Sequence, residues 1–360
     1  MYGGRDGTRE VVSLMPDKTV EFYLVDAFEI FHYQPIYEAL LKAGIDAKMV
    51  AEPCQINTAG GWFDYDTAVD ILQREAIKYS TVCNPRAAVA FTTQYPRNLS
   101  RYSAGTKRIA LTYGVPLNKK VMFWFPQETI QGYDCMFVHG ELFKNLAAPK
   151  MPEKNIVRVS YPKHLNFMKN KIQRNQVMEE LHINPAKPVL LYLPTWDEYS
   201  SIPDFAEQMG SLREKFFVVA KPHHCTARLG HKRNDFEKIL RNADLVLDAN
   251  YSFYKTAMLG DVVVCDAKSG ASTEIPFLRR DVNLVLVKVN AEKKDFVIDI
   301  DQFAYVAERP DQLPICVEKA LAGDAYKKKR QSYVDYFYDR DIEKGLKNAV
   351  EIVKSMLNAV

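Results

Sequence analysis

The sequence predicts an α/β protein made of two domains, each with a parallel β-sheet that helices cover on both faces. Short apolar runs rich in Val, Ile and Leu alternate with amphipathic helical segments along most of the chain. This alternation starts again after the polar, proline-containing segment 184–188, which we take as the domain boundary. The length of 360 residues is also more than one hydrophobic core usually supports.

The composition is that of an ordinary globular protein, with 47% apolar and 26% charged residues. A net charge of +3 is too small to indicate a nucleic-acid partner. The six cysteines form no CxxC pair, which favours reduced thiols and a cytoplasmic protein. No apolar stretch reaches the ~18–20 residues that span a membrane. Residues 1–18 lack the apolar core of a secretory signal, and we expect them to form a leader outside the domains.

The first domain is expected at residues 19–183. Its predicted strands lie at 19–25, 45–50, 87–92, 108–112, 134–139 and 156–159. Its predicted helices lie at 34–43, 66–78 and 166–182. The loop after the first strand has no GxGxxG sequence, which disfavours a dinucleotide site there. This loop instead carries Asp26, Glu29 and His32.

The second domain is expected at residues 184–325, and one or two helices at 326–360 close the chain. Its predicted strands lie at 189–193, 216–220, 245–247, 262–265 and 284–287. The closing helices begin with the basic cluster 327–330, which precedes several aromatic residues. Because basic and aromatic side chains together suit a membrane surface, this cluster either contacts a membrane peripherally or is an ordinary solvated helix face.

Polar motifs follow predicted strands at five places in the chain. They are 26–32, 113–120, 194–197, 221–224 and 269–274. The carboxyl ends of parallel strands meet at one edge of a sheet, and ligands of such folds bind at that edge. Two sheets in tandem therefore predict a ligand cleft between two Rossmann-like domains, which is the layout of a GT-B glycosyltransferase.

The last of these motifs is Ser269-Gly270-Ala271-Ser272-Thr273-Glu274, at the expected start of a helix. Unpaired N–H groups and the helix dipole at such a start favour a phosphate or pyrophosphate. The hydroxyls of Ser269, Ser272 and Thr273 are candidate additional donors, and Glu274 is a candidate acceptor for ribose hydroxyls. The alternative is an ordinary turn in which a serine caps the helix and Glu274 completes a capping box.

The order and spacing of the motifs resemble the CDP-glycerol glycerophosphotransferase family of teichoic acid and capsule assembly, over roughly residues 80 to 340. The similar segments are 109–119 (the family's HGxPxK turn), Tyr133-Asp134 with Gly140, 191–196 (its APTW strand end), Lys221-Pro222-His223 (its K/R-x-H-P turn) and 261–269 (its D-x-x-x-T-D-Y-S-S loop). The resemblance implies a GT-B fold, a CDP-activated polyol or sugar donor, and transfer to a hydroxyl acceptor that is often lipid-linked.

The chain departs from the family pattern at three places. The family's histidine in the HGxPxK turn is Tyr113, its His-Pro pair is His223-His224, and its Tyr-Ser-Ser triplet is Ala267-Lys268-Ser269. These departures leave the donor nucleotide open between CDP and UDP. Neither HxxxH nor paired Cys/His spacing is present, so no metal and no separate cofactor are expected.

The second-domain candidates are expected to bind the donor. His223, with Lys221 and His224, would stabilise the charge that gathers on the departing nucleotide. Thr195 is a candidate phosphate contact, and Trp196 either stacks on the base, walls the cleft or belongs to the core.

The first-domain candidates are expected on the acceptor side. His32 is the candidate base because an unperturbed histidine titrates near neutrality, with Asp26 and Glu29 as alternates. The other interpretation of His32 is a histidine at a helix start that takes no part in chemistry. Tyr113 is too weak a base at neutral pH and is expected to hydrogen-bond the acceptor or stack on a sugar. Gly114 and Lys119 belong to the same turn.

The sequence thus predicts a transferase of a nucleotide-activated glycerol phosphate, polyol phosphate or sugar, acting in cell-surface polymer assembly at the inner face of the membrane or in the cytoplasm. Two alternatives stay open. One is a sugar-nucleotide 2-epimerase of the same shape, which lacks its usual acidic residues in the first domain here. The other is a GT-B protein that binds nucleotide or polymer without catalysis, as the tyrosine at position 113 would allow.

Overall fold

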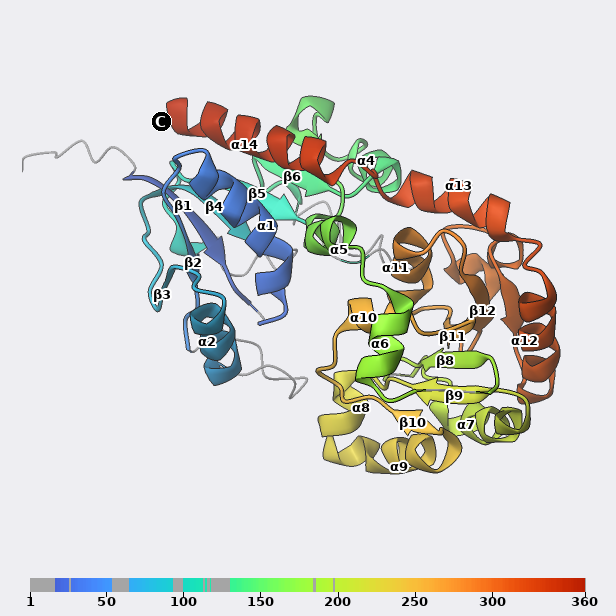
Figure 1. Ribbon diagram of the computed structural model, residues 1–360. Coiled ribbons are helices and arrows are strands. Elements are labelled where there is room, and N and C mark those ends of the chain that lie inside the picture. The colour runs from blue at the N-terminus through green and yellow to red at the C-terminus, as the bar shows by residue number, and fades with distance from the viewer. Residues whose placement is uncertain are drawn as a thin grey trace, which may run out of the picture.

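Two parallel β-sheets in tandem form the protein, as the sequence predicted (Figure 1). The structure is a computed structural model that describes residues 17–25, 27–53, 65–92, 100–112, 114, 117, 130–183, 186–196 and 198–359. All structural statements below concern these residues.

The first sheet has the order β3-β2-β1-β4-β5-β6-β7, and every pairing is parallel. Its strands are β1 (Asp17–Tyr23), β2 (Ala47–Val50), β3 (Tyr79–Ser80), β4 (Ala87–Thr92), β5 (Lys107–Leu111), β6 (Cys135–Val138) and β7 (Ile156–Arg158). The order reverses between β1 and β4, and a crevice opens at the carboxyl ends of strands where such a reversal occurs. The two-residue strand β3 was missed by the sequence analysis.

The helices after these strands are α1 (Glu29–Lys42), α2 (Tyr65–Arg74), α4 (Glu141–Ala147), α5 (Leu165–Asn170) and α6 (Arg174–Glu180). Helix α1 begins before the predicted residue 34 and includes Pro35. The single helix predicted at 166–182 is wrong, because Lys171 adopts a left-handed conformation (φ 37°) that divides α5 from α6.

The second sheet has the order β10-β9-β8-β11-β12-β13, again with every pairing parallel. Its strands are β8 (Val189–Leu193), β9 (Phe217–Ala220), β10 (Leu245–Val246), β11 (Val262–Asp266), β12 (Asn283–Val287) and β13 (Tyr305–Ala307). Here the order reverses between β8 and β11, so the second crevice lies at the ends of these two strands. Strand β13 was not predicted.

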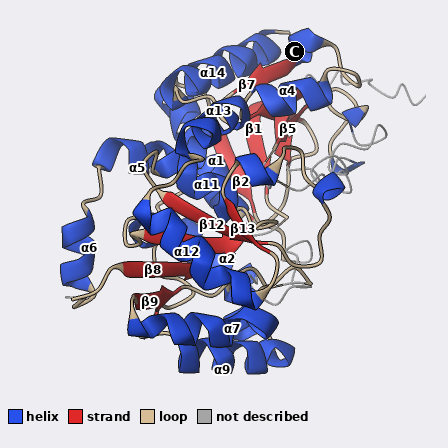
Figure 2. Ribbon diagram, turned by 90° about the vertical axis from the view of Figure 1, so that its right-hand side faces the viewer, coloured by secondary structure: helices blue, strands red, loops and turns tan. Residues whose placement is uncertain are grey.

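Helices flank the second sheet on both faces (Figure 2). They are α7 (Ile202–Ser211), α8 (His224–Arg228), α9 (Arg233–Asn242), α10 (Phe253–Ala257), α11 (Ala271–Leu278) and α12 (Leu313–Ala322). Strand β8 is buried along its whole length, which explains its continuous apolar sequence.

Two closing helices follow, α13 (Lys327–Phe337) and α14 (Ile342–Asn358). Helix α13 packs against α11, whereas α14 crosses to the first domain and packs against α1, β4 and β7 (Figure 1). Gly345 makes this approach possible, because a Cβ at this position would lie 2.2 Å from the carbonyl oxygen of Val159.

The prediction that residues 327–330 form one exposed basic cluster is wrong for Arg330. Its side chain is fully buried, and its guanidinium donates to Asp324 at 2.6 Å and to the carbonyl of Phe303 at 3.0 Å. A charge that is buried in this way needs such partners, so Arg330 is a structural residue. No helix in the described part of the chain is long and apolar enough to cross a membrane.

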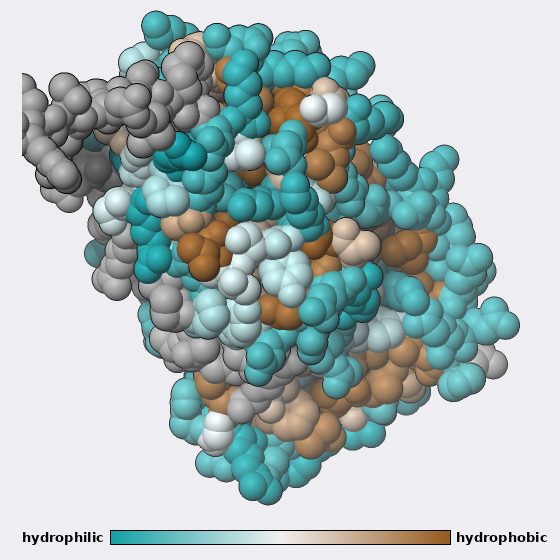
Figure 3. Space-filling view, turned by 90° about the vertical axis from the view of Figure 1, so that its left-hand side faces the viewer, coloured by the Kyte–Doolittle hydropathy of each residue, from teal (hydrophilic) through white to brown (hydrophobic). Residues whose placement is uncertain are grey.

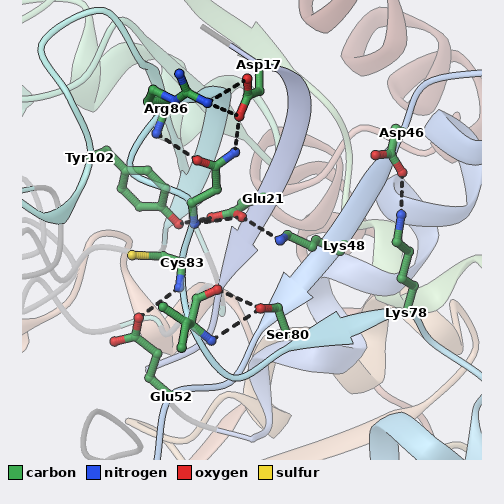
Figure 4. A network of polar contacts seen from close by, with 12 residues as sticks. Asp17, Glu21, Asp46, Lys48, Glu52, Lys78, Ser80, Cys83, Arg86 and Tyr102 are labelled. Carbon is green, nitrogen blue, oxygen red and sulfur yellow. Dashed lines mark hydrogen bonds and ion pairs between the residues drawn. The ribbon is translucent and has the colours of Figure 1, made fainter.

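A buried polar network supports the first sheet (Figure 4). Glu21, inside β1, is fully buried and accepts from the Tyr102 hydroxyl at 2.9 Å and from Lys48 at 3.2 Å. Glu52, just after β2, accepts from the N–H of Cys83 at 3.0 Å. Because every named partner comes from another segment, the carboxylates hold the connections after β3 and β4 against the sheet.

The exposed large apolar side chains are scattered. They are Phe31, Leu41, Val82, Met168, Leu240, Ile315 and Leu321. The face shown in Figure 3 is largely hydrophilic, with hydrophobic residues visible near its top and in a band across its lower part. Single exposed apolar residues of this kind are normal and indicate no binding surface by themselves.

Candidate functional site

The end of β11 is tied to the end of β8 at the crevice of the second sheet. Asp266 is fully buried, and its Oδ2 accepts the backbone N–H of Thr195 at 2.7 Å and that of Ser201 at 3.2 Å. A carboxylate between two strand ends fixes their relative position. Thr195 and Trp196, both half-buried, therefore stand beside the loop that begins at Ala267.

The loop leading into α11 uses most of its polar groups internally. The Ser272 hydroxyl donates to the carbonyl of Ser269 at 2.7 Å, and the Thr273 hydroxyl donates to that of Gly270 at 3.2 Å. Both side chains are fully buried. This contradicts the expectation that these hydroxyls face a phosphate, since in the first turn they bond back to a carbonyl three residues earlier.

The backbone of this loop is paired as well. The N–H of Ala271 donates to the Ser269 hydroxyl at 3.2 Å, and that of Glu274 donates to the carbonyl of Gly270 at 3.1 Å. No side chain caps α11 at Gly270, so the alternative of a capping box is not realised either. Ser269, Gly270 and Ala271 are half-buried and are the part of the motif that a ligand can reach.

The end of β9 places His223 next to Trp196. The two rings are stacked with centroids 6.0 Å apart, and the ring of His224 lies 3.9 Å from that of His223. His223 caps α8, because its Nδ1 accepts the N–H of Cys225 at 3.2 Å. Burial, with His224 and Lys221 nearby, lowers the pKa of His223 well below its usual value. At neutral pH His223 is thus an uncharged ring whose Nε2 carries the proton and can donate.

Lys221 reaches in another direction. Its Nζ donates to the carbonyl of Ala249 at 2.8 Å, in the loop after β10, and burial lowers its pKa. A surface depression of about 420 Å³ lies on this side, lined by Ala227 of α8, Leu240 of α9 and residues 248–250. Lys221 therefore supports one wall of this depression through its hydrogen bond to Ala249.

One group of possible metal ligands occurs in the described residues. The ligand atoms of His223, His224 and Cys225 lie within 4.8 Å of one another. One nitrogen of His223 already accepts from the Cys225 backbone. The expectation of a metal-independent site stays a prediction.

The first domain contributes a second group of side chains, centred on Tyr161. Ser160, two residues after the end of β7, has a positive φ of 62° and directly precedes Tyr161. The Tyr161 hydroxyl accepts the N–H of Gly114 at 3.0 Å and donates to Oε1 of Glu274 at 3.3 Å. Its ring is stacked on that of Tyr338 at 5.4 Å. Tyr161 thus joins the first sheet to α11 and to the end of α13.

An ion pair between the domains lies beside Tyr161. Lys163 Nζ is 2.8 Å from Oε2 of Glu274, whose side chain is 9% exposed. The motif at residues 269–274 predicted that this carboxylate faces a ribose. In the structure, both of its oxygens instead contact residues of the first domain.

Three buried histidines surround the same tyrosine: His32, His139 and His164 lie 5.5, 4.3 and 4.6 Å from its ring. The Nδ1 of His139 donates to the carbonyl of Ser160 at 2.8 Å, which leaves Nε2 as a bare acceptor. Burial lowers the pKa of His139 to about 3, and it lowers the pKa values of His32 and His164 well below normal. All three rings are therefore uncharged at neutral pH.

The tautomer of His164 follows from its neighbours. Tyr254 has one hydroxyl proton, which it donates to the carbonyl of Lys163 at 2.7 Å. The Nδ1 of His164, 3.2 Å from the same hydroxyl, must then be the donor. Its unprotonated Nε2 faces Glu274 at 3.6 Å, and this contact between a neutral ring and a carboxylate is not an ion pair.

The structure thus brings the predicted residues together in two neighbouring groups. Thr195, Trp196, His223, His224 and Ser269 lie along the carboxyl edge of the second sheet, and His32, Gly114, Thr273 and Glu274 lie at the junction of the domains. Glu29 is buried inside the first domain, where it accepts the N–H of Val25 at 2.6 Å. Asp26, Tyr113 and Lys119 lie outside the described residues.

Four residues of the first domain that hold the junction were not predicted from the sequence: Tyr161, Lys163, His139 and His164. A signal for them was present, because the segment Tyr161-Pro162-Lys163-His164 follows a predicted strand, as the five selected motifs do. Their contacts with Glu274 were not predictable, since more than a hundred residues separate them in the chain.

Comparison with known proteins gives a fold and no closer assignment. No family model matches the sequence, and a search of the curated proteins finds no match. Among solved structures, a variant of the wall teichoic acid polymerase TagF soaked with CDPG has a TM-score of 0.64 at 14% identity, over 95% of this chain and 89% of that chain. The chain has the GT-B fold.

Other GT-B structures are as similar. MnaA of S. aureus in complex with UDP has a TM-score of 0.64 at 13% identity, over 96% of this chain and 98% of that chain. The UDP-GlcNAc 2-epimerase of Neisseria meningitidis bound to UDP-GlcNAc has a TM-score of 0.59 at 12% identity, over 95% of this chain and all of that chain. At such identities the likeness establishes the GT-B fold alone.

Proposed function

We propose that this protein is a GT-B transferase that moves a glycerol phosphate, polyol phosphate or sugar from a CDP- or UDP-linked donor to a hydroxyl acceptor in cell-surface polymer assembly. The observation that carries the proposal is the row of side chains at the reversal point of the second sheet. His223 stacks on Trp196, and Thr195 is tied to Asp266, which precedes the accessible Ser269. Ligands of open α/β sheets bind at this point of the fold.

The depression of about 420 Å³ between α8, α9 and the loop after β10 has the size of a small-molecule site and supports a ligand in the second domain. In this proposal the Ser269 hydroxyl, which accepts from Ala271 and retains its own proton, donates to a phosphate oxygen. Glu274 accepts from the ribose hydroxyls. No separate cofactor or metal takes part.

In the transfer of a glycerol phosphate, the acceptor hydroxyl attacks the phosphorus that carries the glycerol. The bond from this phosphorus to the bridging oxygen breaks, and the nucleoside monophosphate leaves with that oxygen. The Nε2–H of His223 donates to a phosphate oxygen of the leaving group and stabilises its growing charge. The acceptor proton passes to His32, whose low pKa the negative charge of a bound donor would raise.

A thermal-shift series with CMP, CDP, UDP and their sugar or glycerol conjugates tests nucleotide binding. We expect a cytidine or uridine nucleotide to raise the melting temperature, and Ser269→Ala to reduce that rise. Turnover of the best donor is then measured as release of the free nucleotide. His223→Ala should slow turnover by about 100-fold or more, the usual loss for one donor to developing charge.

The exposed His231 provides the matched control, and His231→Ala should change nothing. The absence of any nucleotide-dependent shift at millimolar concentration would end the proposal. Binding without turnover would instead favour a GT-B protein that has lost catalysis.

A second candidate function is epimerisation at C2 of a sugar nucleotide. It is favoured by the TM-score of 0.64 with MnaA, which equals that with TagF. Incubation with UDP-GlcNAc and separation of the products distinguishes the two functions. An epimerase inverts C2 of the sugar and needs no acceptor, whereas a transferase makes no epimer and turns over only with an acceptor.

A further inference from the structure

We propose that the first domain occupies Glu274 in an autoinhibitory contact, and that a nucleotide donor must displace Lys163 and Tyr161 from this carboxylate to bind. The inference rests on the proposed function, in which Glu274 receives the ribose hydroxyls. It adds that donor binding and the contact between the domains compete for the same two oxygen atoms.

Both oxygens of Glu274 contact groups from the first domain. Lys163 Nζ lies 2.8 Å from Oε2, and the Tyr161 hydroxyl lies 3.3 Å from Oε1. Each carboxylate oxygen has two lone pairs, so a ribose diol that donates two hydrogen bonds must approach oxygens that each already hold one first-domain group. The carboxylate is almost fully buried, so little of it remains for a third partner.

The segment that carries these two donors is anchored in both domains. The carbonyl of Ser160 accepts from His139 of the first domain at 2.8 Å. The carbonyl of Lys163 accepts from Tyr254 of α10, in the second domain, at 2.7 Å. Residues 160–164 therefore form a short arm of the first domain that the second domain holds in place.

The arm places the ion pair in a mostly buried position, where it stabilises the contact between the domains more than a surface ion pair would. The Lys163 side chain is 19% exposed and that of Glu274 is 9% exposed, and the ammonium also lies 4.8 Å from the centre of the Tyr161 ring. Loss of one member of such a pair leaves the other charge buried without a partner. A ribose can supply replacement hydrogen bonds, so the energy needed to break the pair enters the apparent affinity for the nucleotide.

The size of the effect follows from population arithmetic. A nucleotide that binds only when Glu274 is released has an apparent Kd equal to its intrinsic Kd divided by the released fraction. If the contact holds Glu274 for most of the time, removal of Lys163 should tighten nucleotide binding by about 3- to 10-fold. A lysine that instead touched the donor phosphates would have the opposite effect on affinity when removed.

The test compares the full chain with two lysine variants by titration calorimetry with CDP and UDP. Lys163→Met keeps the apolar stem and removes the ammonium. The control is Lys169→Met, since Lys169 pairs with Glu343 at 3.3 Å on the exposed surface and both side chains are more than half exposed. We expect tighter nucleotide binding for Lys163→Met and an unchanged Kd for Lys169→Met.

Two further measurements test the inhibitory contact even if Lys163→Met folds poorly. Tyr161→Phe retains the ring and removes only the hydroxyl, and it should tighten binding by about 2-fold. In the unmodified protein, addition of nucleotide should speed amide hydrogen exchange over residues 160–168, because the arm is released.

The failure of each idea gives a different result. Unchanged or weaker binding by both Lys163→Met and Tyr161→Phe, with binding by the unmodified protein intact, overturns the inhibitory contact and leaves the proposed function standing. Slower exchange of residues 160–168 on nucleotide addition overturns it as well. No nucleotide binding by any of these proteins overturns both.

Discussion

The two domains share one topology but use the carboxyl edge of the sheet differently. Both sheets are parallel, and both reverse their strand order next to the first strand of the domain, at β1/β4 and at β8/β11. In the second domain, half-buried side chains such as Trp196 and His223 remain accessible at that edge. In the first domain, the corresponding edge carries His139 and Tyr161, which are both buried, and Tyr161 contacts Glu274 of the second domain. The same architecture therefore presents a surface in one half and a contact in the other.

The strands β8 and β1, which occupy equivalent places in the two sheets, also differ in polarity. The central strand β8 is wholly apolar, whereas β1 contains the buried carboxylate of Glu21 with its hydrogen-bonded partners. An apolar strand needs only packing, but a buried carboxylate needs every partner in place. The second domain also contains buried charges, but these lie at the end of β11, in Asp266, and in a closing helix, in Arg330, and not inside the first strand of the sheet.

The largest expected effect tests the second domain. Arg330→Met should lower the free energy of unfolding by about 3–5 kcal/mol, because Asp324 would remain buried without its partner. Urea denaturation measures this. The control, Lys329→Met on the exposed side of the same helix, should change stability by less than about 0.5 kcal/mol. Equal effects of the two substitutions would contradict the structural role of Arg330.

The next largest effect tests the packing of the first domain against the end of α13. A Cβ at Gly140 would lie 2.5 Å from the carbonyl oxygen of Phe337, at the end of α13. Gly140→Ala should therefore cost about 1–3 kcal/mol through overpacking against backbone. Gly230→Ala meets no atom within 4 Å and serves as the control. If Gly140→Ala is as stable as the control, the close packing of the domain against α13 is in doubt.

The pH dependence of stability sharpens the contrast between the two edges. The pKa of His139 is about 3 in the folded chain, below the ~6.5 of an unfolded histidine, so the unfolded state binds the proton first. Its contribution to stability is complete above pH ~6.5 and is lost as the pH falls toward 3, at up to ~1.4 kcal/mol per pH unit.

Replacement of the His139 ring should make the free energy of unfolding depend less steeply on pH. We expect His139→Gln to lose less stability than the unmodified protein between pH 6.5 and 4.5, as measured by urea denaturation. The matched change at the exposed His231, His231→Gln, should leave the slope as it was. A slope that does not respond to His139→Gln would mean that this histidine is not buried in solution.

The smallest effect concerns the loop before α11. The Ser272 hydroxyl is buried and bonded to Ser269, so Ser272→Ala should alter nucleotide affinity by less than about 2-fold and cost about 0.5–1.5 kcal/mol of stability. Ser269→Ala should show the reverse pattern, with weaker binding and nearly unchanged stability. Calorimetry with CDP and urea denaturation measure the two quantities, and a larger loss of affinity in Ser272→Ala would contradict the structure of this turn.

Much of the fold could be predicted because its strands are buried on both sides. The runs that form β4 and β8 were predicted to the residue, since a continuous apolar sequence marks a central parallel strand. Strands β3 and β13 have two and three residues, too few for a periodic signal. The start of α1 was misplaced because Glu29 and His32, which lie in the helix, were assigned to the loop after the first strand.

The sequence predicted which residues belong to the candidate site, but not the direction in which their side chains point. The motifs at strand ends identified His223, Trp196 and Glu274, because position along a strand follows from local sequence. The burial of Ser272 depends on the residue at which α11 begins, and the sequence did not fix that residue. The engagement of Glu274 by Lys163 depends on packing between domains, for which the sequence contains no local signal.

The return of α14 to the first domain has a mechanical consequence. The chain passes between the domains twice, once before β8 and once between α13 and α14. Two such tethers permit rotation about the line that joins them and resist separation or twisting in other directions. They also mean that a fragment cut at the end of the second sheet would contain every strand of the first domain and still lack the helix that covers it.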